Sequence, residues 1–170
     1  MKRYGIYELI SAFHALNDKN YKLLICGHHA NEHELSEAIG DNKNIVYLHT
    51  LPVEKVLQLE MNAIANINPR PYSEDLDRFS IPSKTMEYLS SGRPTISVKN
   101  TRLQKDFNEF AVWAKSSNPD DLLASMKRVL ELTEEEQAEL GKKARTKVLS
   151  LYSLTKLNEI LTNFLESFLA

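Results

Sequence analysis

Short apolar runs alternate with segments whose apolar residues recur at helical spacing over roughly the first two thirds of the chain. The runs that predict buried strands lie at 23–26, 45–49, 63–68, 94–98 and, more weakly, 111–114. The segments that predict helices lie at 4–16, 32–39 and 53–61, with a helix opening at the PSK of 82–84 and a loop or short helix at 101–109. This alternation is typical of a parallel sheet covered on both faces. We therefore expect an α/β fold, a Rossmann-like three-layer α/β/α domain with a mainly parallel sheet.

The rest of the pattern, after residue 114, is helical. One helix is expected at 119–131, capped by Asn118, and another at 133–150, which opens with a capping box of Thr133 and Glu136. The last segment, 153–170, carries an apolar stripe that we expect to pack on this domain or on a partner domain. No repeat, low-complexity tract or linker divides the chain, so residues 1–170 are expected to form one domain with C-terminal helices.

Composition and charge exclude several classes of protein. At 170 residues with 42% hydrophobic content, the chain can bury a substantial core. A formal net charge of -2 without a basic run argues against a nucleic-acid partner. No apolar stretch approaches the ~20 residues of a transmembrane segment, and the N-terminus lacks the apolar core of a signal peptide. The single cysteine, Cys26, ends the apolar run LLIC and is expected in the core of a cytoplasmic protein.

The stretch 66–98 holds the most distinctive chemistry. It predicts a strand, a long polar loop, a short helix, a Gly turn and a second strand. Ser80 or Ser83 is available to cap the helix, and Gly92 is placed to end it. Open α/β sheets bind ligands at the carboxyl ends of their strands, so the start of this helix is expected at the ligand-binding edge.

The start of this helix suits a nucleotide. Its unpaired backbone N–H groups carry the partial positive charge of the helix dipole, and Lys84 adds a full charge, so a phosphate is favoured. Glu87 shares a face with Ser83 and Lys84, where its carboxylate can accept hydrogen bonds from ribose hydroxyls. The alternative is a capped core helix on which Lys84 and Glu87 form only a solvated ion pair.

Arg70 stands between two prolines at the end of a predicted strand. Its guanidinium group can hold a phosphate in a bidentate manner. The alternative is a structural ion pair with Glu74 or Asp75.

Two patterns resemble metal sites. His29 and His33 stand at i,i+4 beside His28, but a polar loop and helix start explain them more simply. Asp75 and Asp77 have acid-x-acid spacing, which we interpret as loop polarity on this α/β pattern. We therefore assign no metal site.

Three stretches together resemble a known family. They are NPRP at 68–71, PSKTMEYLSSGRPTI at 82–96 and the closing ARTKV with YSL at 144–154. The chain is similar to the C-terminal, donor-binding half of the retaining glycosyltransferases of group 1, which have the two-domain GT-B fold. The resemblance implies transfer of a sugar from a nucleotide diphosphate donor, a UDP-sugar or GDP-sugar, without a bound metal or other cofactor. It also implies a role in cell-surface polysaccharide synthesis, in the cytoplasm or at the inner face of the membrane.

The resemblance also implies roles for individual residues. Glu87 matches the glutamate that holds the donor ribose, and the helix start, Pro82, Ser83 and Lys84, matches the segment that meets the diphosphate. Arg70 and Lys84 are the candidates for stabilising the leaving group. Tyr47 and His49 belong to the loop region that matches the one lining the base.

Two departures concern the chemistry. Many members carry a further glutamate eight positions before the ribose glutamate, where this chain has Phe79, and Asp75 or Asp77 would have to substitute. Many also carry a lysine before the glycine that opens the first helix, where this chain has Tyr4, so that Arg3 or Arg70 would supply the charge. The alternative function is therefore a catalytically degenerate domain that serves as a binding or scaffold subunit.

A third departure is architectural. In the family a strand precedes the helix at 4–16 and lies between the strands expected at 23–26 and 63–68, and this sequence has no residues for it. Either the sequence is a fragment, or the neighbouring strands close the gap, or another chain or the missing N-terminal, acceptor-binding domain fills it. Because unpaired strand edges promote association, we expect a homo-oligomer formed through this gap. The domain alone should bind donor weakly and transfer little.

Overall fold

The computed structural model describes residues 4–77 and 81–168, in which helices and short parallel strands alternate. The helices are α1 (Ile6–Leu16), α2 (Glu32–Ile39), α3 (Val53–Asn62), α4 (Glu74–Asp77), α5 (Ser83–Ser90), α6 (Thr101–Phe107), α7 (Pro119–Leu130), α8 (Glu134–Tyr152) and α9 (Leu154–Glu166). The strands are β1 (Leu23–Ile25), β2 (Ile45–Tyr47), β3 (Asn66–Asn68), β4 (Thr95–Val98) and β5 (Val112–Ala114). The α/β prediction is confirmed.

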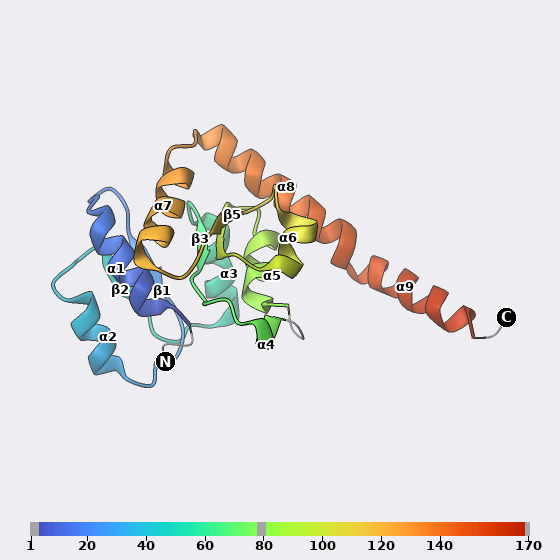
Figure 1. Ribbon diagram of the computed structural model, residues 1–170, viewed down its shortest axis with the longest axis horizontal. Coiled ribbons are helices and arrows are strands. Elements are labelled where there is room, and N and C mark those ends of the chain that lie inside the picture. Colours follow the sequence, from blue (N-terminus) through green and yellow to red (C-terminus); the bar gives the residue numbers. More distant parts are fainter. Residues whose placement is uncertain (1–3, 78–80, 169–170) are drawn as a thin grey trace.

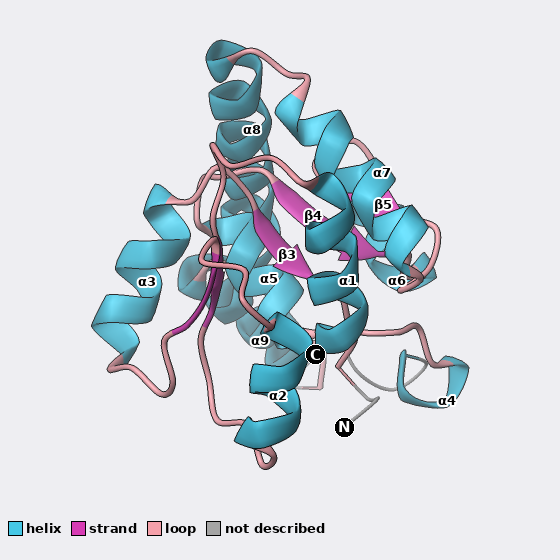
Figure 2. Cartoon of the chain, turned by 90° about the vertical axis from the view of Figure 1, so that its left-hand side faces the viewer, coloured by secondary structure: helices cyan, strands magenta, loops and turns pink. Residues whose placement is uncertain are grey.

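The strands form two parallel ladders. β1 pairs with β2, and β3, β4 and β5 lie side by side in that order (Figure 2). All residues of β4 are buried, as expected of a central strand covered on both faces. β1 and β3 are not paired with each other, so the strands flanking the predicted gap do not close it.

Two apolar clusters give the domain its three layers (Figure 1). On one face, α1 and α7 pack over the strands through residues such as Leu9, Phe13 and Met126. On the other, α5, α6 and α8 pack together around Leu89 and Phe107. α3 lies beside α5 on this second face, where the Arg93 Nε atom donates a hydrogen bond to the Met61 carbonyl at 2.6 Å.

The helix ends confirm some predicted caps and correct others. Asn118 caps α7, and Thr133 forms the predicted capping box with Glu136 at the start of α8. Gly92 has a φ of 82° just beyond α5, the left-handed conformation predicted to end that helix. Ser83 does not cap α5, because the cap position is Pro82 and Ser83 is the first helical residue. The predicted polar loop before α5 contains the short helix α4, which was not predicted.

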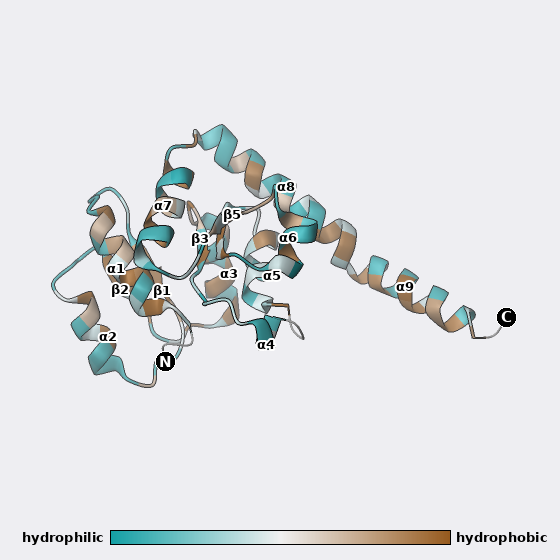
Figure 3. Cartoon of the chain, viewed as in Figure 1, coloured by the Kyte–Doolittle hydropathy of each residue, from teal (hydrophilic) through white to brown (hydrophobic). Residues whose placement is uncertain are grey.

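One expectation about burial is wrong, and one of the two alternatives for the last helix is excluded. Cys26 is exposed, and so is Leu24 in the same apolar run, because both lie on the open side of β1. The apolar stripe of α9 does not pack on this domain, since no residue of that helix is buried. Figure 3 shows these apolar residues along a helix that extends away from the body of the molecule.

Candidate functional site

The N-terminus of α5 lies at the carboxyl ends of β3 and β4. Pro82 is buried at the cap position and has no N–H to donate, while Ser83 and Lys84 in the first turn of the helix are exposed. Within the described residues, no side chain caps this end of the helix. The partial positive charge of such a helix start is the property on which the phosphate prediction for the PSK motif depends.

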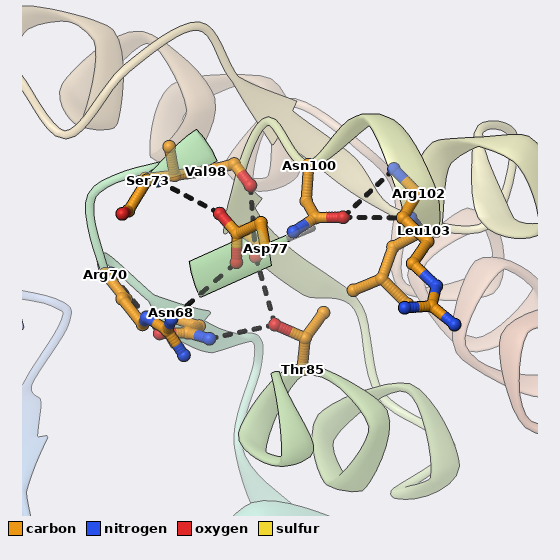
Figure 4. A network of polar contacts seen from close by, with 10 residues as sticks. Asn68, Arg70, Ser73, Asp77, Thr85, Val98, Asn100, Arg102 and Leu103 are labelled. Atoms are coloured by element: carbon orange, nitrogen blue, oxygen red, sulfur yellow. Dashed lines mark hydrogen bonds and ion pairs between the residues drawn. The ribbon is translucent and has the colours of Figure 1, made fainter. Parts of the chain in front are cut away.

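A chain of hydroxyl and amide groups fixes α5 to both strands (Figure 4). The Asn68 side chain on β3 donates a hydrogen bond to the Thr85 Oγ1 atom at 2.8 Å, and Thr85 and Ser97 share a hydrogen bond of 3.2 Å between their hydroxyl oxygens. Asn68 also accepts a hydrogen bond from the Arg70 backbone N–H. Thr85 and Ser97 are buried, so these bonds set the depth at which the start of the helix lies.

Arg70 points toward Asp77 at the same edge. Its Nη2 atom lies 3.6 Å from Asp77 Oδ1, and the other carboxylate oxygen accepts a hydrogen bond from the Ser73 backbone N–H at 3.0 Å. Asp77 is only 6% exposed. The acidic partner of Arg70 is therefore Asp77, not the predicted Glu74 or Asp75.

Lys84 lies between two carboxylates on the side of α5 that faces α3. Its Nζ atom is 2.9 Å from Glu87 Oε2 and 3.6 Å from Glu60 Oε1. Burial raises the pKa of Glu60, the neighbouring Glu87 raises it further, and Lys84 offsets only part of this. Burial lowers the pKa of Lys84, but the two carboxylates outweigh it and the net pKa is raised. Lys84 and Glu87 thus form the ion pair of the alternative interpretation, and Glu60 is a third member that was not predicted.

The carboxyl end of β2 forms a separate aromatic group. The Tyr47 and His49 rings lie 4.3 Å apart between centroids, and the Tyr47 hydroxyl donates a hydrogen bond to the Gly27 carbonyl. His49 has a φ of 54°, which is uncommon for a residue with a side chain, and its Nδ1 atom is 3.2 Å from a Glu32 oxygen. The backbone turns sharply here and leaves the His49 ring exposed.

The family model of glycosyl transferases group 1 matches residues 1–147. The chain belongs to this family. A comparison with curated proteins found no match.

Solved structures of glycosyltransferases have a similar fold. Sucrose-phosphate synthase from Thermosynechococcus elongatus is 16% identical with a TM-score of 0.76, over 99% of this chain and 43% of that chain. Anabaena HepE in complex with UDP and glucose is 14% identical with a TM-score of 0.76, over 98% of this chain and 46% of that chain. Trehalose-6-phosphate synthase OtsA is 9% identical with a TM-score of 0.74, over 96% of this chain and 41% of that chain. The group 1 chain described here thus spans less than half the length of these structures.

The structure places the predicted site residues in three separate groups. Arg70 lies with Asp77, Lys84 with Glu87, and Tyr47 with His49, and no contact between the groups is seen within the described residues. Asn68, Thr85 and Ser97, which fix the helix start, were not predicted. The polar residues within the strands at 66–68 and 95–98 were the available signal for Asn68 and Ser97.

Some predictions fall outside what the structure tests. Arg3, Phe79 and Ser80 lie outside the described residues. Among those described, no cluster of three or more His, Cys, Asp or Glu side chains is suited to hold a metal ion. Within residues 4–77 and 81–168, no helix is both long and apolar enough to cross a membrane.

Proposed function

We propose that this group 1 domain binds the nucleotide part of a nucleotide diphosphate sugar, as the donor domain of a glycosyltransferase. The observation that carries the proposal is the exposed start of α5, which no described side chain caps and which lies at the carboxyl edge of the sheet with Glu87 one turn further along. The diphosphate accepts hydrogen bonds from the backbone N–H groups at Ser83 and Lys84, and Glu87 accepts hydrogen bonds from the ribose hydroxyls. Tyr47 and His49 line the base.

Transfer in such an enzyme depends on stabilising the charge that develops on the leaving nucleotide diphosphate. The helix dipole and the cations of Arg70 and Lys84 provide this stabilisation without a metal, and the donor linkage is cleaved with retention of configuration. A separate N-terminal domain supplies the acceptor, so this domain alone binds donor weakly and transfers little. The proposed setting is cell-surface polysaccharide synthesis in the cytoplasm or at the inner face of the membrane.

Calorimetry with UDP and GDP tests the proposal, and Glu87→Ala is the decisive variant. Loss of the Glu87 carboxylate should weaken UDP or GDP binding by about 1–3 kcal/mol, because a charged hydrogen-bond acceptor is removed. This corresponds to roughly a 5- to 150-fold increase in Kd. Glu139→Ala is the matched control, since Glu139 forms a similar exposed ion pair with Lys143 at 2.7 Å on α8 and should leave the Kd unchanged. Equal Kd values for wild type and Glu87→Ala would remove Glu87 from the site.

A second candidate function is a degenerate domain that binds a partner without turnover. It is favoured by the position of Asp77, whose buried carboxylate is held by Arg70 and Ser73 and so does not replace the family acid at position 79. A folded domain that binds neither UDP nor GDP at millimolar concentration would support this function over donor binding. Saturable UDP or GDP binding would argue against it.

A further inference from the structure

Two carboxylates of unequal burial share the ammonium group of Lys84. The Lys84 Nζ atom lies 2.9 Å from Glu87 Oε2, within hydrogen-bond distance, and 3.6 Å from Glu60 Oε1, just beyond it. The Glu60 side chain is 8% exposed, whereas that of Glu87 is 32% exposed. The ammonium group is therefore bonded to the carboxylate that solvent also reaches, and not to the one that is buried.

Glu60 lacks the hydrogen bonds that a buried carboxylate needs. Its Oε2 atom is buried and has no hydrogen-bond partner within the described residues. Leaving a buried acceptor without a donor is costly, and more so when the acceptor is charged. Lys84 carries three N–H donors, so it is able to supply the missing bond.

The backbone of Glu60 is fixed within reach of α5. Asn66 at the start of β3 is buried, and its side-chain amide donates hydrogen bonds to the Glu60 carbonyl at 3.0 Å and to the Ser91 hydroxyl at 3.1 Å. Ser91 is the C-cap of α5, so this one side chain joins the end of α3 to α5. A small rotation of the Lys84 side chain is then enough to bring its ammonium group to the buried carboxylate.

We propose that Glu60 is a positioning residue for the nucleotide, which receives the Lys84 ammonium group when ribose hydroxyls bind Glu87. This role rests on the proposed function, because it requires a ribose at Glu87. The hydroxyls supply Glu87 with hydrogen-bond donors of their own, so Lys84 is released to Glu60 and both Glu87 oxygens accept from the ribose. Because both carboxylates already lie within 3.6 Å of the Nζ atom, the exchange keeps the ammonium charge beside the start of α5.

The exchange couples nucleotide binding to the proton of Glu60. In the nucleotide-free chain, burial raises the pKa of Glu60 above 4.5, Glu87 raises it further, and Lys84 offsets only part of this. A closer ammonium group favours the charged carboxylate, so it lowers the pKa of Glu60 in the complex. Nucleotide affinity should therefore rise as the pH increases toward the raised pKa of the nucleotide-free chain, and level off above it. The titratable groups that face Glu60 or share its cavity are Lys84, Glu87 and Tyr88 on α5, with Lys22 and Cys26 on either side of β1.

Calorimetric titration of the wild type and of Glu60→Gln with UDP, or with GDP where that is the nucleotide bound, tests this role. The variant keeps the shape of the side chain but cannot carry the charge that attracts Lys84, and it should fold because it removes a buried charge. The ratio of the two Kd values should be smallest at pH 4.5, where most of Glu60 is protonated and resembles glutamine. By pH 8 the variant should bind about fivefold more weakly or worse. The nucleotide phosphates titrate alike with both chains, so their effect cancels in this ratio.

Two further variants separate the route from a general effect. Glu54→Gln is the matched control, because Glu54 is an exposed residue of the same helix, and it should give the wild-type Kd at every pH. In a Lys84→Met background, adding Glu60→Gln should leave the pH profile unchanged, since the ammonium group through which Glu60 acts is absent.

Carbon NMR of the wild-type side chain gives a measurement that depends on no variant. The midpoint of the Glu60 carboxyl titration should fall when UDP or GDP saturates the site, because the ammonium group then lies closer to this carboxylate.

Three results would overturn the role of Glu60. The first is a ratio of Kd values that is the same at pH 4.5 and pH 8, and the second is a Glu60 midpoint that the nucleotide leaves unchanged or raises. The third is an effect of Glu60→Gln that is equally large without Lys84. Each of these leaves nucleotide binding by the wild type intact, so the proposed function stands. Failure of the proposed function is distinct, because neither UDP nor GDP then binds the wild type at any pH, and both proposals are overturned together.

Discussion

Glu60 is buried where a carboxylate is costly, and its Oε1 atom lies 3.6 Å from the Lys84 Nζ atom. Because burial and Glu87 both raise its pKa above the ordinary value of 4.5, Glu60 binds a proton more tightly in the folded chain than in the unfolded one. Its contribution to stability is therefore full at low pH and is lost as the pH rises through the folded-state pKa.

Glu60→Gln removes this pH-dependent penalty. The variant should match the wild type in Tm at pH 4, below the ordinary pKa, and exceed it increasingly as the pH rises toward 8, with Lys84 still paired to Glu87. Thermal unfolding by circular dichroism across this range measures the difference. A Tm gap that narrows as the pH rises would contradict the assignment, and Glu54→Gln, an exposed position at the start of the same helix, is the control.

Asp77 is predicted to be a structural acid. Asp77→Asn keeps the shape of the side chain but leaves the Arg70 guanidinium without its counter-ion, so the free energy of unfolding should fall by about 1–3 kcal/mol. Asp75→Asn lies two positions earlier and is exposed, and it should change stability by less than about 0.5 kcal/mol. Urea unfolding measures the free energy of unfolding of both variants. Equal losses in the two would mean that the ion pair of Arg70 with Asp77 contributes nothing to stability.

At the scale of single elements, the position of α5 depends on a close contact with α8. A Cβ atom built on Gly141 would lie 2.1 Å from the Gly92 carbonyl oxygen and 2.7 Å from the Arg93 Cα atom. Both neighbours are backbone atoms of the turn that ends α5, so they cannot give way as a flexible side chain would.

Gly141→Ala should therefore destabilise the fold, although alanine is normally favoured over glycine in a helix by about 0.5–1 kcal/mol. We expect a loss of about 1–3 kcal/mol in urea unfolding, typical of overpacking, together with weaker UDP binding as the start of α5 shifts. Lys142→Ala, on the exposed face one residue along, is the control and should change stability by less than about 0.5 kcal/mol. A gain in stability for Gly141→Ala would show that α5 and α8 can move apart to accept a Cβ atom at little energetic cost.

Most elements were predictable because their signals are local. Helical spacing and caps located α2 and α7 almost to the residue, since Asn118 and the apolar pattern act within a turn or two. Cys26 and Glu60 were not predictable in the same way. The exposure of Cys26 and the burial of Glu60 depend on a groove between segments that are distant in sequence. The acid that pairs with Arg70 depends on α4, a helix of one turn with a weak periodic signal.

For the molecule as a whole, the uncovered surface of α9 is the feature that a single domain does not explain. Its apolar side chains, Leu154, Leu157, Ile160, Leu161, Phe164 and Leu165, are between 47% and 76% exposed. A stripe of this kind normally packs on another surface, and an isolated helix of 13 residues is marginal in water. The stability of α9 should therefore depend on something other than this domain.

Hydrogen exchange of the isolated chain tests this expectation against a matched helix. α7 has 12 residues and buries Leu122, Met126 and Val129, whereas α9 has 13 and buries none. Backbone amides in the second half of α9 should exchange within about tenfold of the unfolded rate, and those in α7 should exchange orders of magnitude more slowly, because only α7 must leave a core to open. Slow exchange in α9 at every protein concentration would show that this domain covers the helix. Slow exchange that appears only at high concentration would place its cover in a second copy.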